Sequence, residues 1–339
     1  MGVHRWLLGL EGLWDAARRR RAGRRTPAHF RIEPYIGHGG AESVVVRGRV
    51  LDDPPLSEAV DGEGLRAAIR RTVRGFLTDE LPGVPLRVQV AGTTVEMVTD
   101  DEGYFFARLR PEAARLTSPW SGGTVELDGA YRGLTNPHST PVEIRVAGPE
   151  ARLGIVSDID DTILETGVQR TGRMVRNTLI GSAVTRTAFE GAAELYRDLS
   201  AEVNPVFYVS SSPWNLHAFL VAFLRRRGFP LGPVLLRDLL GTSKGREEKS
   251  GRIREILDLH PGLPFVLIGD SAEQDPEIYA EIVRAYPGRI RAVFIREVRL
   301  DPGDGRVERV SRTWSPDVPF VLAADSDAVR RHATELGLL

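Results

Sequence analysis

After Ala151 the sequence alternates short apolar runs with longer segments of helical character, and this alternation constrains the fold more than any other feature. It predicts a parallel sheet with helices on both faces, because neighbouring parallel strands must be joined by a crossover connection. Ligands of such sheets bind at the carboxyl ends of the strands, so the residues that follow each strand are the candidates for a functional site. Six strands are expected, at residues 153–157, 205–210, 233–236, 264–269, 290–295 and 319–323.

The first expected strand ends in Ser157-Asp-Ile-Asp-Asp-Thr-Ile163, which brings three carboxylates together. Asp158 and Asp160 point the same way from an extended backbone, because side chains alternate with a period of two. Such a pair repels itself unless a cation lies between the carboxylates or their pKa values are pushed apart, and both outcomes suit phosphoryl chemistry. The alternative is an Asp-rich turn with solvated side chains, because short motifs recur by chance.

Three consecutive serines, Ser210, Ser211 and Ser212, lie at the end of the strand expected at 205–210. Pro213 suits the first position of a helix and Ser212 suits its N-cap, so a helix N-terminus is expected here. Its backbone N–H groups would face an anion, and the Ser210 hydroxyl could donate to a phosphate oxygen. The alternative is that Ser210, Ser211 and Ser212 serve only the cap and the turn.

A second acidic cluster, Asp270-Ser-Ala-Glu-Gln-Asp275, follows the strand at 264–269. Asp270 could reach a metal ion held by Asp158. Asp275 could support that ion through a bound water or pair with Lys249, because Mg²⁺ keeps several waters and takes few protein carboxylates. Asp275 precedes Pro276 and is therefore also an ordinary helix N-cap.

Lysine occurs twice in the chain, at Lys244 and Lys249, although Lys and Arg together number 45. A compact ammonium acts as a point charge where the wide guanidinium group does not fit, so the segment 242–249 is a candidate for a site lysine. Chance placement of two lysines is the alternative.

The joint order of these motifs resembles the four motifs of the haloacid-dehalogenase superfamily of phosphohydrolases: an Asp-x-Asp-x-Thr segment, a strand followed by serines, a lysine, and Gly-Asp followed by Asp275. The segments 157–163, 208–215 and 268–279 resemble, more closely, the actin-patch type of phosphatidate phosphatase and its bacterial relatives. The resemblance covers residues 150 to 339. The β-rich segment before residue 150 also resembles the N-terminal region of the same relatives, but it contains fewer recognisable motifs. It implies an α/β fold with a Rossmann-like parallel sheet.

The resemblance implies roles for the matching residues. Asp158 would be the nucleophile that forms an aspartyl-phosphate, and Asp160 would protonate the leaving oxygen and then activate water. Mg²⁺ would be bound by Asp158, by Asp270 and by the backbone carbonyl of Asp160, with Asp275 in support. The residues implied to orient or neutralise the phosphate are Thr162, Ser210, Ser211 and Lys249, with Lys244 as a possible substitute for Lys249. The segment 165–180 is too short for a large cap domain and predicts a small lid.

The chain before residue 150 has a different pattern. Short alternating or β-branched segments predict a β-sandwich-like domain with one helical insertion, at 64–77. The expected strands are 43–50, 85–90, 93–98, 103–109 and 142–146. The predicted division is therefore an N-terminal helix at 1–30, a β-rich domain at 31–149 and a catalytic domain at 150–339.

The N-terminal segment combines an apolar helical face with a basic tail. Trp6, Leu10, Leu13 and Trp14 share one face, and Arg18 to Arg21 follow. Insertion of this face among anionic lipid headgroups would make residues 1–25 a peripheral membrane contact. Packing against the protein itself is the alternative.

Composition narrows the remaining choices. The chain of 339 residues has no cysteine, which excludes disulfides, thiolate catalysis and zinc-thiolate sites, and its net charge of −1 gives no general attraction to nucleic acid. No apolar run approaches the roughly 18 residues that span a bilayer, so no integral membrane protein is expected. The predicted function is a Mg²⁺-dependent phosphomonoesterase acting on phosphatidate, in the cytoplasm or peripherally on the inner membrane face. The alternatives are a soluble phosphatase of sugar, nucleotide or nucleic-acid phosphates and a non-catalytic lipid- or protein-binding scaffold; the oligomeric state is not predicted.

Overall fold

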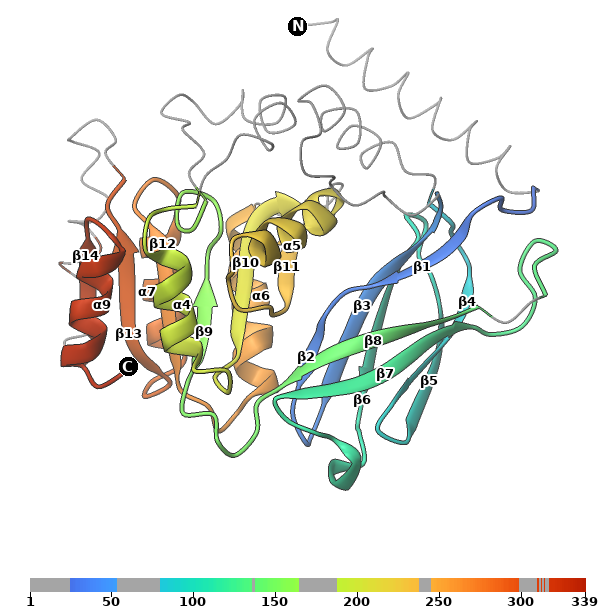
Figure 1. Ribbon diagram of the computed structural model, residues 1–339, viewed down its shortest axis with the longest axis horizontal. Coiled ribbons are helices and arrows are strands. Elements are labelled where there is room, and N and C mark those ends of the chain that lie inside the picture. Colours follow the sequence, from blue (N-terminus) through green and yellow to red (C-terminus); the bar gives the residue numbers. More distant parts are fainter. Residues whose placement is uncertain are drawn as a thin grey trace, which may run out of the picture.

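The computed structural model describes residues 25–53, 80–135, 138–164, 188–237, 245–298, 310, 312, 314 and 317–339. These residues form two sheets, one antiparallel for the most part and one parallel, which lie side by side (Figure 1). The predicted helix at 64–77, the predicted lid at 165–180 and residues 1–24 of the predicted N-terminal helix lie outside the described residues. Residues 25–30 are not helical, and Phe30 begins the first strand, so the predicted extension of the helix to residue 30 is wrong. The predicted domain boundaries stay predictions.

The second half of the chain contains a parallel sheet of six strands. Every strand pair in it is parallel, and the spatial order is β11-β10-β9-β12-β13-β14. All six strands expected from the sequence are present, which confirms the predicted α/β class. The strands are β9 (Gly154–Ser157), β10 (Val206–Pro213), β11 (Val234–Arg237), β12 (Phe265–Asp270), β13 (Ile290–Arg296) and β14 (Phe320–Ala323).

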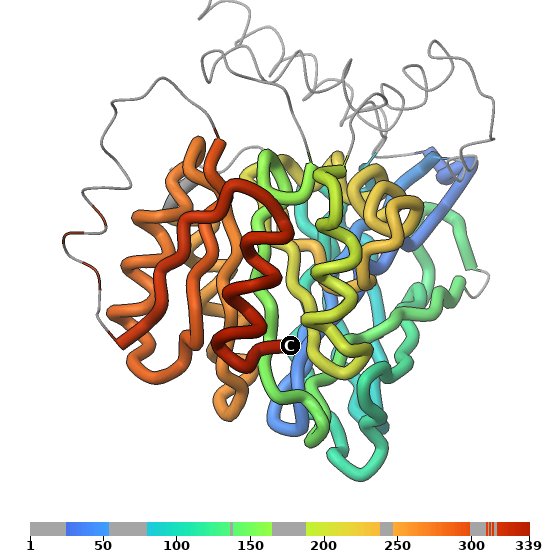
Figure 2. The backbone as a smooth tube through the Cα atoms, turned by 60° about the vertical axis from the view of Figure 1, so that its left-hand side comes forward, coloured from blue at the N-terminus to red at the C-terminus, as the bar shows by residue number. Residues whose placement is uncertain are grey.

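Helices cover both faces of this sheet (Figures 1 and 2). Each strand buries alternate residues on opposite faces, so Val206 and Tyr208 enter one apolar core while Phe207 and Val209 enter the other. The first core is covered by α4 (Ala192–Ser200), α5 (His217–Arg226) and α9 (Ser326–Glu335). The second core is covered by α6 (Gly245–Leu259) and α7 (Asp275–Ala285).

The first half forms an eight-stranded sheet around a third apolar core, in agreement with the predicted β-rich region. Its order is β1-β3-β2-β8-β7-β4-β5, with β6 on the other edge of β3. The five expected strands are present, and β1, β2 and β7 are additional. The strands are β1 (Phe30–Pro34), β2 (Gly37–Gly39), β3 (Val44–Asp52), β4 (Pro85–Val90), β5 (Thr93–Val98), β6 (Tyr104–Leu109), β7 (Trp120–Leu127) and β8 (Ser139–Val146).

Aromatic and ionic contacts join the two regions. Tyr35, between β1 and β2, stacks on Trp214, with ring centroids 5.1 Å apart. The Arg47 guanidinium of β3 donates two hydrogen bonds to the Glu255 carboxylate of α6, at 2.6 and 2.7 Å. Because both contacts connect residues far apart in the sequence, the antiparallel region is packed directly against the parallel one.

A pair of buried histidines lies at the same boundary. His38 of β2 stacks on His260, which follows α6, with ring centroids 5.9 Å apart, and both rings contact Phe207. Neither ring nitrogen of His38 has a hydrogen-bond partner. Burial lowers the pKa of His38 well below its usual value and that of His260 to about 4, so both rings are neutral near pH 7.

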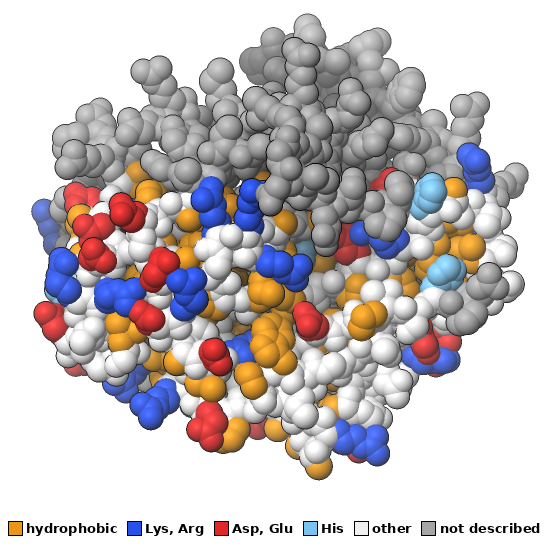
Figure 3. Space-filling model, viewed as in Figure 1, with side chains coloured by type: hydrophobic (Ala, Val, Ile, Leu, Met, Phe, Trp, Pro, Cys, Tyr) orange, Lys and Arg blue, Asp and Glu red, His pale blue; other side chains and the backbone are white. Residues whose placement is uncertain are grey.

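The surface has no separation of charge on the face shown in Figure 3, where acidic and basic side chains are interspersed. This matches the net charge of −1. Across the part of the chain that the structure describes, no helix has the length and apolar character needed to cross a membrane.

Candidate active site

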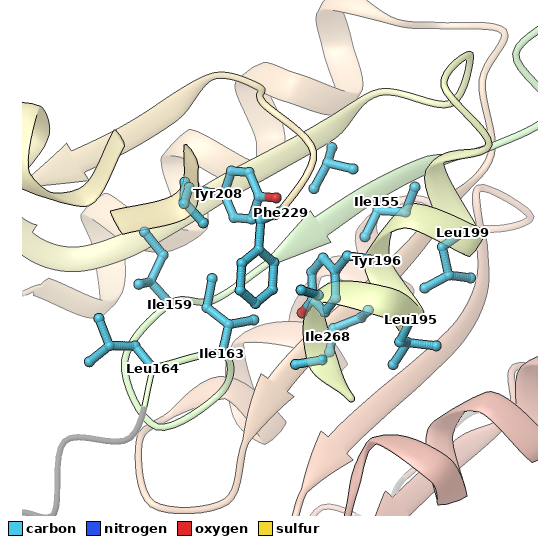
Figure 4. Packing of buried hydrophobic residues seen from close by; sticks show 14 of the residues in the cluster. Ile155, Ile159, Ile163, Leu164, Leu195, Tyr196, Leu199, Tyr208, Phe229 and Ile268 are labelled. Atoms are coloured by element: carbon cyan, nitrogen blue, oxygen red, sulfur yellow. The ribbon is translucent and has the colours of Figure 1, made fainter. Parts of the chain in front are cut away.

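The segment after β9 is fixed by the apolar residues that separate its acids. Ile159, Ile163 and Leu164 are fully buried in the core of the parallel region, where Figure 4 shows them with Tyr208 and Phe229. Anchoring these three side chains fixes the backbone of the acidic segment at the carboxyl end of the sheet.

Asp158 is fully buried directly after β9, where its backbone N–H donates to the Ile268 carbonyl of β12, 2.9 Å away. Its Oδ1 accepts a hydrogen bond of 2.7 Å from the Lys249 ammonium. Its Oδ2 is buried and has no hydrogen-bond partner. One oxygen of this carboxylate is therefore held by a cation, and the other is open to a further ligand or to an electrophile.

The tip of β12 brings a second and a third carboxylate to the same place. Asp270 Oδ1 accepts hydrogen bonds from the backbone N–H groups of Ala272 and Glu273, at 2.6 and 2.9 Å, and its Oδ2 is buried without a partner. Asp275 Oδ2 accepts from the Asp270 N–H at 3.2 Å, and its Oδ1 lies 2.5 Å from Lys249 Nζ. Asp275 is the first residue of α7 and Gln274 is the N-cap, so the predicted capping role of Asp275 is wrong.

These three carboxylates form a site that fits a divalent cation. One oxygen each of Asp158, Asp270 and Asp275 lies within 4.8 Å of the other two. Two of these carboxylates, those of Asp158 and Asp270, have a buried Oδ2 without a hydrogen-bond partner. Buried carboxylate oxygens without hydrogen bonds are costly, and an oxygen-binding cation is the ligand that satisfies them.

The electrostatics also favour a cation. Burial raises the pKa of Asp158 well above its usual value, and Lys249 opposes this rise. Burial and then repulsion from Asp275 and Glu273 raise the pKa of Asp270 to about 8. Burial alone would lower the pKa of Lys249, but Asp158 and Asp275 hold it well above its usual value. One ammonium thus faces several carboxylates, and additional positive charge would keep those carboxylates ionised.

Two serine hydroxyls bind the carboxylate of Asp160. Its Oδ2 accepts hydrogen bonds from Ser210 Oγ at 2.9 Å and from Ser212 Oγ at 3.0 Å. The expected N-cap role of Ser212 is wrong, because β10 continues through Pro213 and a short 3-10 helix begins only at Trp214. Since Ser210 and Ser212 are two residues apart in an extended strand, both side chains reach the same carboxylate.

Three further residues were predicted for the site: Thr162, Ser211 and Lys244. Thr162, two residues after Asp160, is buried, and its hydroxyl has no hydrogen-bond partner. Ser211 lies between Ser210 and Ser212 in β10, so its side chain leaves the strand on the other side. Lys244 lies outside the described residues.

Glu273 is a member of the cluster that sequence reasoning did not select. Its Oε2 lies 3.6 Å from Lys249 Nζ, and its side chain is 37% exposed, whereas Asp158 and Asp275 are fully buried. Burial raises its pKa. Its position three residues after Asp270, in the turn before α7, is the signal that could have identified it.

Comparison with known proteins agrees with this geometry. Residues 153–297 match the family described as "Phosphatidate phosphatase APP1, catalytic domain". The phosphatidate phosphatase APP1 of Saccharomyces cerevisiae is 30% identical over 243 residues, which cover 67% of this chain and 40% of the yeast protein. An uncharacterized protein of Schizosaccharomyces pombe is 33% identical over 159 residues, 44% of this chain and 26% of that protein. The chain therefore spans less than half the length of either relative.

Two solved structures show a more distant likeness. A haloacid-dehalogenase family hydrolase from Deinococcus radiodurans, with bound phosphate and sodium, is 18% identical, with a TM-score of 0.38 over 56% of this chain and 99% of that one. A class C acid phosphatase from Bacillus anthracis is 18% identical, with a TM-score of 0.32 over 55% of this chain and 80% of that one. Residues 153–297 therefore resemble the catalytic domain of the phosphatidate phosphatase APP1 family.

Proposed function

We propose that this protein is a Mg²⁺-dependent phosphomonoesterase that forms an aspartyl-phosphate on Asp158 and acts on phosphatidate or a related lipid phosphate. One observation supports this most strongly. Asp158 has one carboxylate oxygen held by Lys249 and one buried oxygen without a partner, directly beside two further carboxylates suited to a cation.

In the proposed first step, the Asp158 carboxylate attacks the phosphorus atom and the bond from phosphorus to the ester oxygen breaks. The Lys249 ammonium favours the ionised form of Asp158 and offsets part of the negative charge of the phosphate. A divalent cation bound by Asp158, Asp270 and Asp275 would supply the remaining positive charge for transfer of the phosphoryl group. These assignments explain why a lysine is buried among carboxylates at the ends of adjacent strands.

Asp160 is assigned to proton transfer. It gives its proton to the departing ester oxygen, and its carboxylate then takes a proton from the water that attacks the aspartyl-phosphate. Water attack breaks the bond between phosphorus and Asp158 and releases inorganic phosphate. The hydrogen bonds from Ser210 and Ser212 fix the orientation of Asp160 for both steps.

The lipid substrate has two supports. The S. cerevisiae relative is a phosphatidate phosphatase, and residues 1–25 of this chain have the sequence of an amphipathic helix with a basic tail. We propose a cytoplasmic enzyme that reaches phosphatidate on the inner membrane face through this segment. Liposome co-sedimentation of the full chain and of a chain starting at residue 26 tests that contact, and equal binding by both would refute it.

The reaction is tested by measuring phosphate release from phosphatidate in mixed micelles and from a panel of soluble phosphomonoesters, with Mg²⁺ and after chelation by EDTA. Wild-type protein should release phosphate only with the metal ion. We expect Asp160→Asn to lower kcat by about 100- to 10,000-fold, and Asp158→Asn to lower it at least as much. Glu96→Gln is the matched control, because Glu96 is an exposed carboxylate of β5.

The possible results separate the candidate functions. Activity restricted to soluble esters would keep the mechanism and reject the lipid substrate. Metal-dependent phosphate release by Asp158→Asn would refute the nucleophile. Absence of activity on all substrates would favour a binding module over an enzyme.

A further inference from the structure

A groove of about 620 Å³ runs between the antiparallel region and helix α6. One side is lined by β3 and by the hairpin of β5 and β6, and the other by Trp214 and α6. Five of its twelve lining residues are aromatic and four are charged. Phe106 keeps 49% of its surface exposed. The aromatic residues are Tyr35, Tyr104, Phe105, Phe106 and Trp214. The volume is in the range that binds small organic ligands.

The groove is built on two segments of the chain that also carry residues of the proposed active site. Trp214 follows two residues after Ser212, which holds Asp160. Arg252 follows three residues after Lys249 in α6, a separation of about one helical turn. The Tyr104 hydroxyl donates to the Asn215 side chain at 3.3 Å, which ties the wall of the groove to the same segment. The segment 212–214 at the end of β10 and helix α6 therefore each contribute residues both to the groove and to the proposed active site.

Charged groups in the groove already have partners. Arg47 pairs with Glu255 at 2.6 Å and lies over the Phe106 ring, 4.6 Å from its centroid. Arg252 lies 3.8 Å from Glu255 and over the Trp214 ring, at 5.9 Å.

Asp100, the fourth charged lining residue, accepts hydrogen bonds from the backbone N–H groups of Glu102 and Tyr104, both at 2.9 Å. Because two basic and two acidic groups line the groove, and because both guanidinium groups lie over aromatic rings, the groove carries little unbalanced charge. This favours an uncharged, apolar ligand segment.

One polar group in the groove is unused. The Tyr35 hydroxyl is buried and has no hydrogen-bond partner. Its ring is held in place by stacking on Trp214 and on His217, with centroids 5.1 and 3.8 Å away. A buried hydroxyl without a partner is costly, and an ester carbonyl is an uncharged acceptor that would satisfy it.

We propose that this groove binds one fatty acyl chain of a phosphatidate substrate, with the Tyr35 hydroxyl donating to the carbonyl of the acyl ester. The proposal rests on the proposed function and adds a role for the antiparallel region, which supplies Tyr35, Tyr104 and Phe106 to the groove. That region thereby selects substrates with a long acyl chain.

The chain-length dependence of kcat/KM tests the role of Phe106. Dioleoyl and dihexanoyl phosphatidate are compared at the same surface concentration in mixed micelles. Phe106→Ala should lower the ratio of kcat/KM for the long chain to that for the short chain about tenfold, because it removes a large apolar contact. Leu322→Ala is the control, because Leu322 is a comparably exposed apolar residue on β14 and should keep the wild-type ratio. An equal ratio in both variants would overturn the proposal.

The proposed contact of the Tyr35 hydroxyl with the ester carbonyl is tested by comparing ester-linked with ether-linked lipids. Tyr35→Phe removes only the hydroxyl and should lower kcat/KM several-fold for ester-linked phosphatidate. For the ether-linked analogue, which has no carbonyl, the same substitution should have little effect. Equal loss on both lipids would overturn the assignment of Tyr35.

A binding measurement separates failure of the groove from failure of the proposed reaction. Lysophosphatidate with a brominated acyl chain, kept below its micellar concentration, should quench the fluorescence of wild-type protein more than that of Trp214→Phe, and Phe106→Ala should reduce the difference. If no substrate is hydrolysed but the fluorescence of Trp214 is quenched, the proposed function is wrong and the assignment of the groove as an acyl-chain site is supported. Equal quenching with and without Trp214 would overturn that assignment, whatever the enzyme hydrolyses.

Discussion

Ser211 and Ser212 are neighbours in β10 but have different surroundings. Substituting each of them separately therefore measures the contribution of one hydrogen bond. The Ser212 hydroxyl donates to Asp160 at 3.0 Å, whereas Ser211 leaves the extended strand on the other side. We expect Ser212→Ala to lower kcat by up to about tenfold, because a hydrogen bond contributes about 0.5–1.5 kcal/mol and this one orients the proton donor. Steady-state kinetics of Ser212→Ala and Ser211→Ala make the comparison. An equal loss in Ser211→Ala would contradict the assignment.

At the scale of single residues, the sequence predicted proximity better than it predicted individual contacts. Asp158 and Asp270 follow adjacent parallel strands, so their approach follows from the sheet topology alone. The contact of Ser212 with Asp160 was missed because Pro213 suggested the start of a helix, whereas pairing with β11 extends the strand through Pro213. Hydrogen bonds formed across the sheet decided this point, and they are not visible in a local sequence pattern.

At the scale of elements, Gly269 allows α7 to begin close to β12. A Cβ atom added at Gly269 would lie 2.4 Å from Asp275 Oδ2 and 2.8 Å from the Tyr279 ring. Both contacts are with buried side chains, so Gly269→Ala should displace Asp275 from the cluster and lower the free energy of unfolding by about 1–3 kcal/mol. Gly251→Ala in α6 is the matched control: nothing lies within 4 Å of its added Cβ, and alanine should stabilise the helix by about 0.5–1 kcal/mol. Urea unfolding of both variants measures the two effects, and destabilisation by Gly251→Ala alone would refute the steric argument.

A strand could be predicted from the sequence when its own apolar residues stabilise it, and not when pairing with distant strands does. Apart from β14, which has the exposed Leu322, the parallel strands are short apolar runs largely buried on both faces, and such runs are visible in the sequence. In contrast, β2 is Gly-His-Gly and β7 contains Gly122 and Gly123, which are poor strand formers. Their pairing with β3, β8 and β4 supplies the missing hydrogen bonds, so these strands depend on contacts far away in the sequence.

At the scale of the whole molecule, acid should weaken the boundary between the two regions. His38 has a pKa well below its usual value because it is buried, and His260, Arg47 and Arg108 add repulsion. In the unfolded chain a histidine binds a proton near pH 6.5, so below that pH the unfolded state binds more protons than the folded state. The stability contributed by a neutral His38 is thus complete above about pH 6.5 and is lost as the pH falls toward the lowered folded pKa.

His38→Phe tests this coupling, because neither ring nitrogen of His38 has a hydrogen-bond partner to lose and the ring already packs on Phe207. The variant should match the wild type in Tm at pH 7.5. At pH 5 it should be more stable by up to about 2 kcal/mol, since its unfolded state no longer gains that proton. Thermal unfolding at the two pH values measures the difference, with His332→Gln on the exposed face of α9 as the control that keeps the wild-type response. Equal acid sensitivity of His38→Phe and the wild type would show that the buried histidine does not couple the two regions to pH.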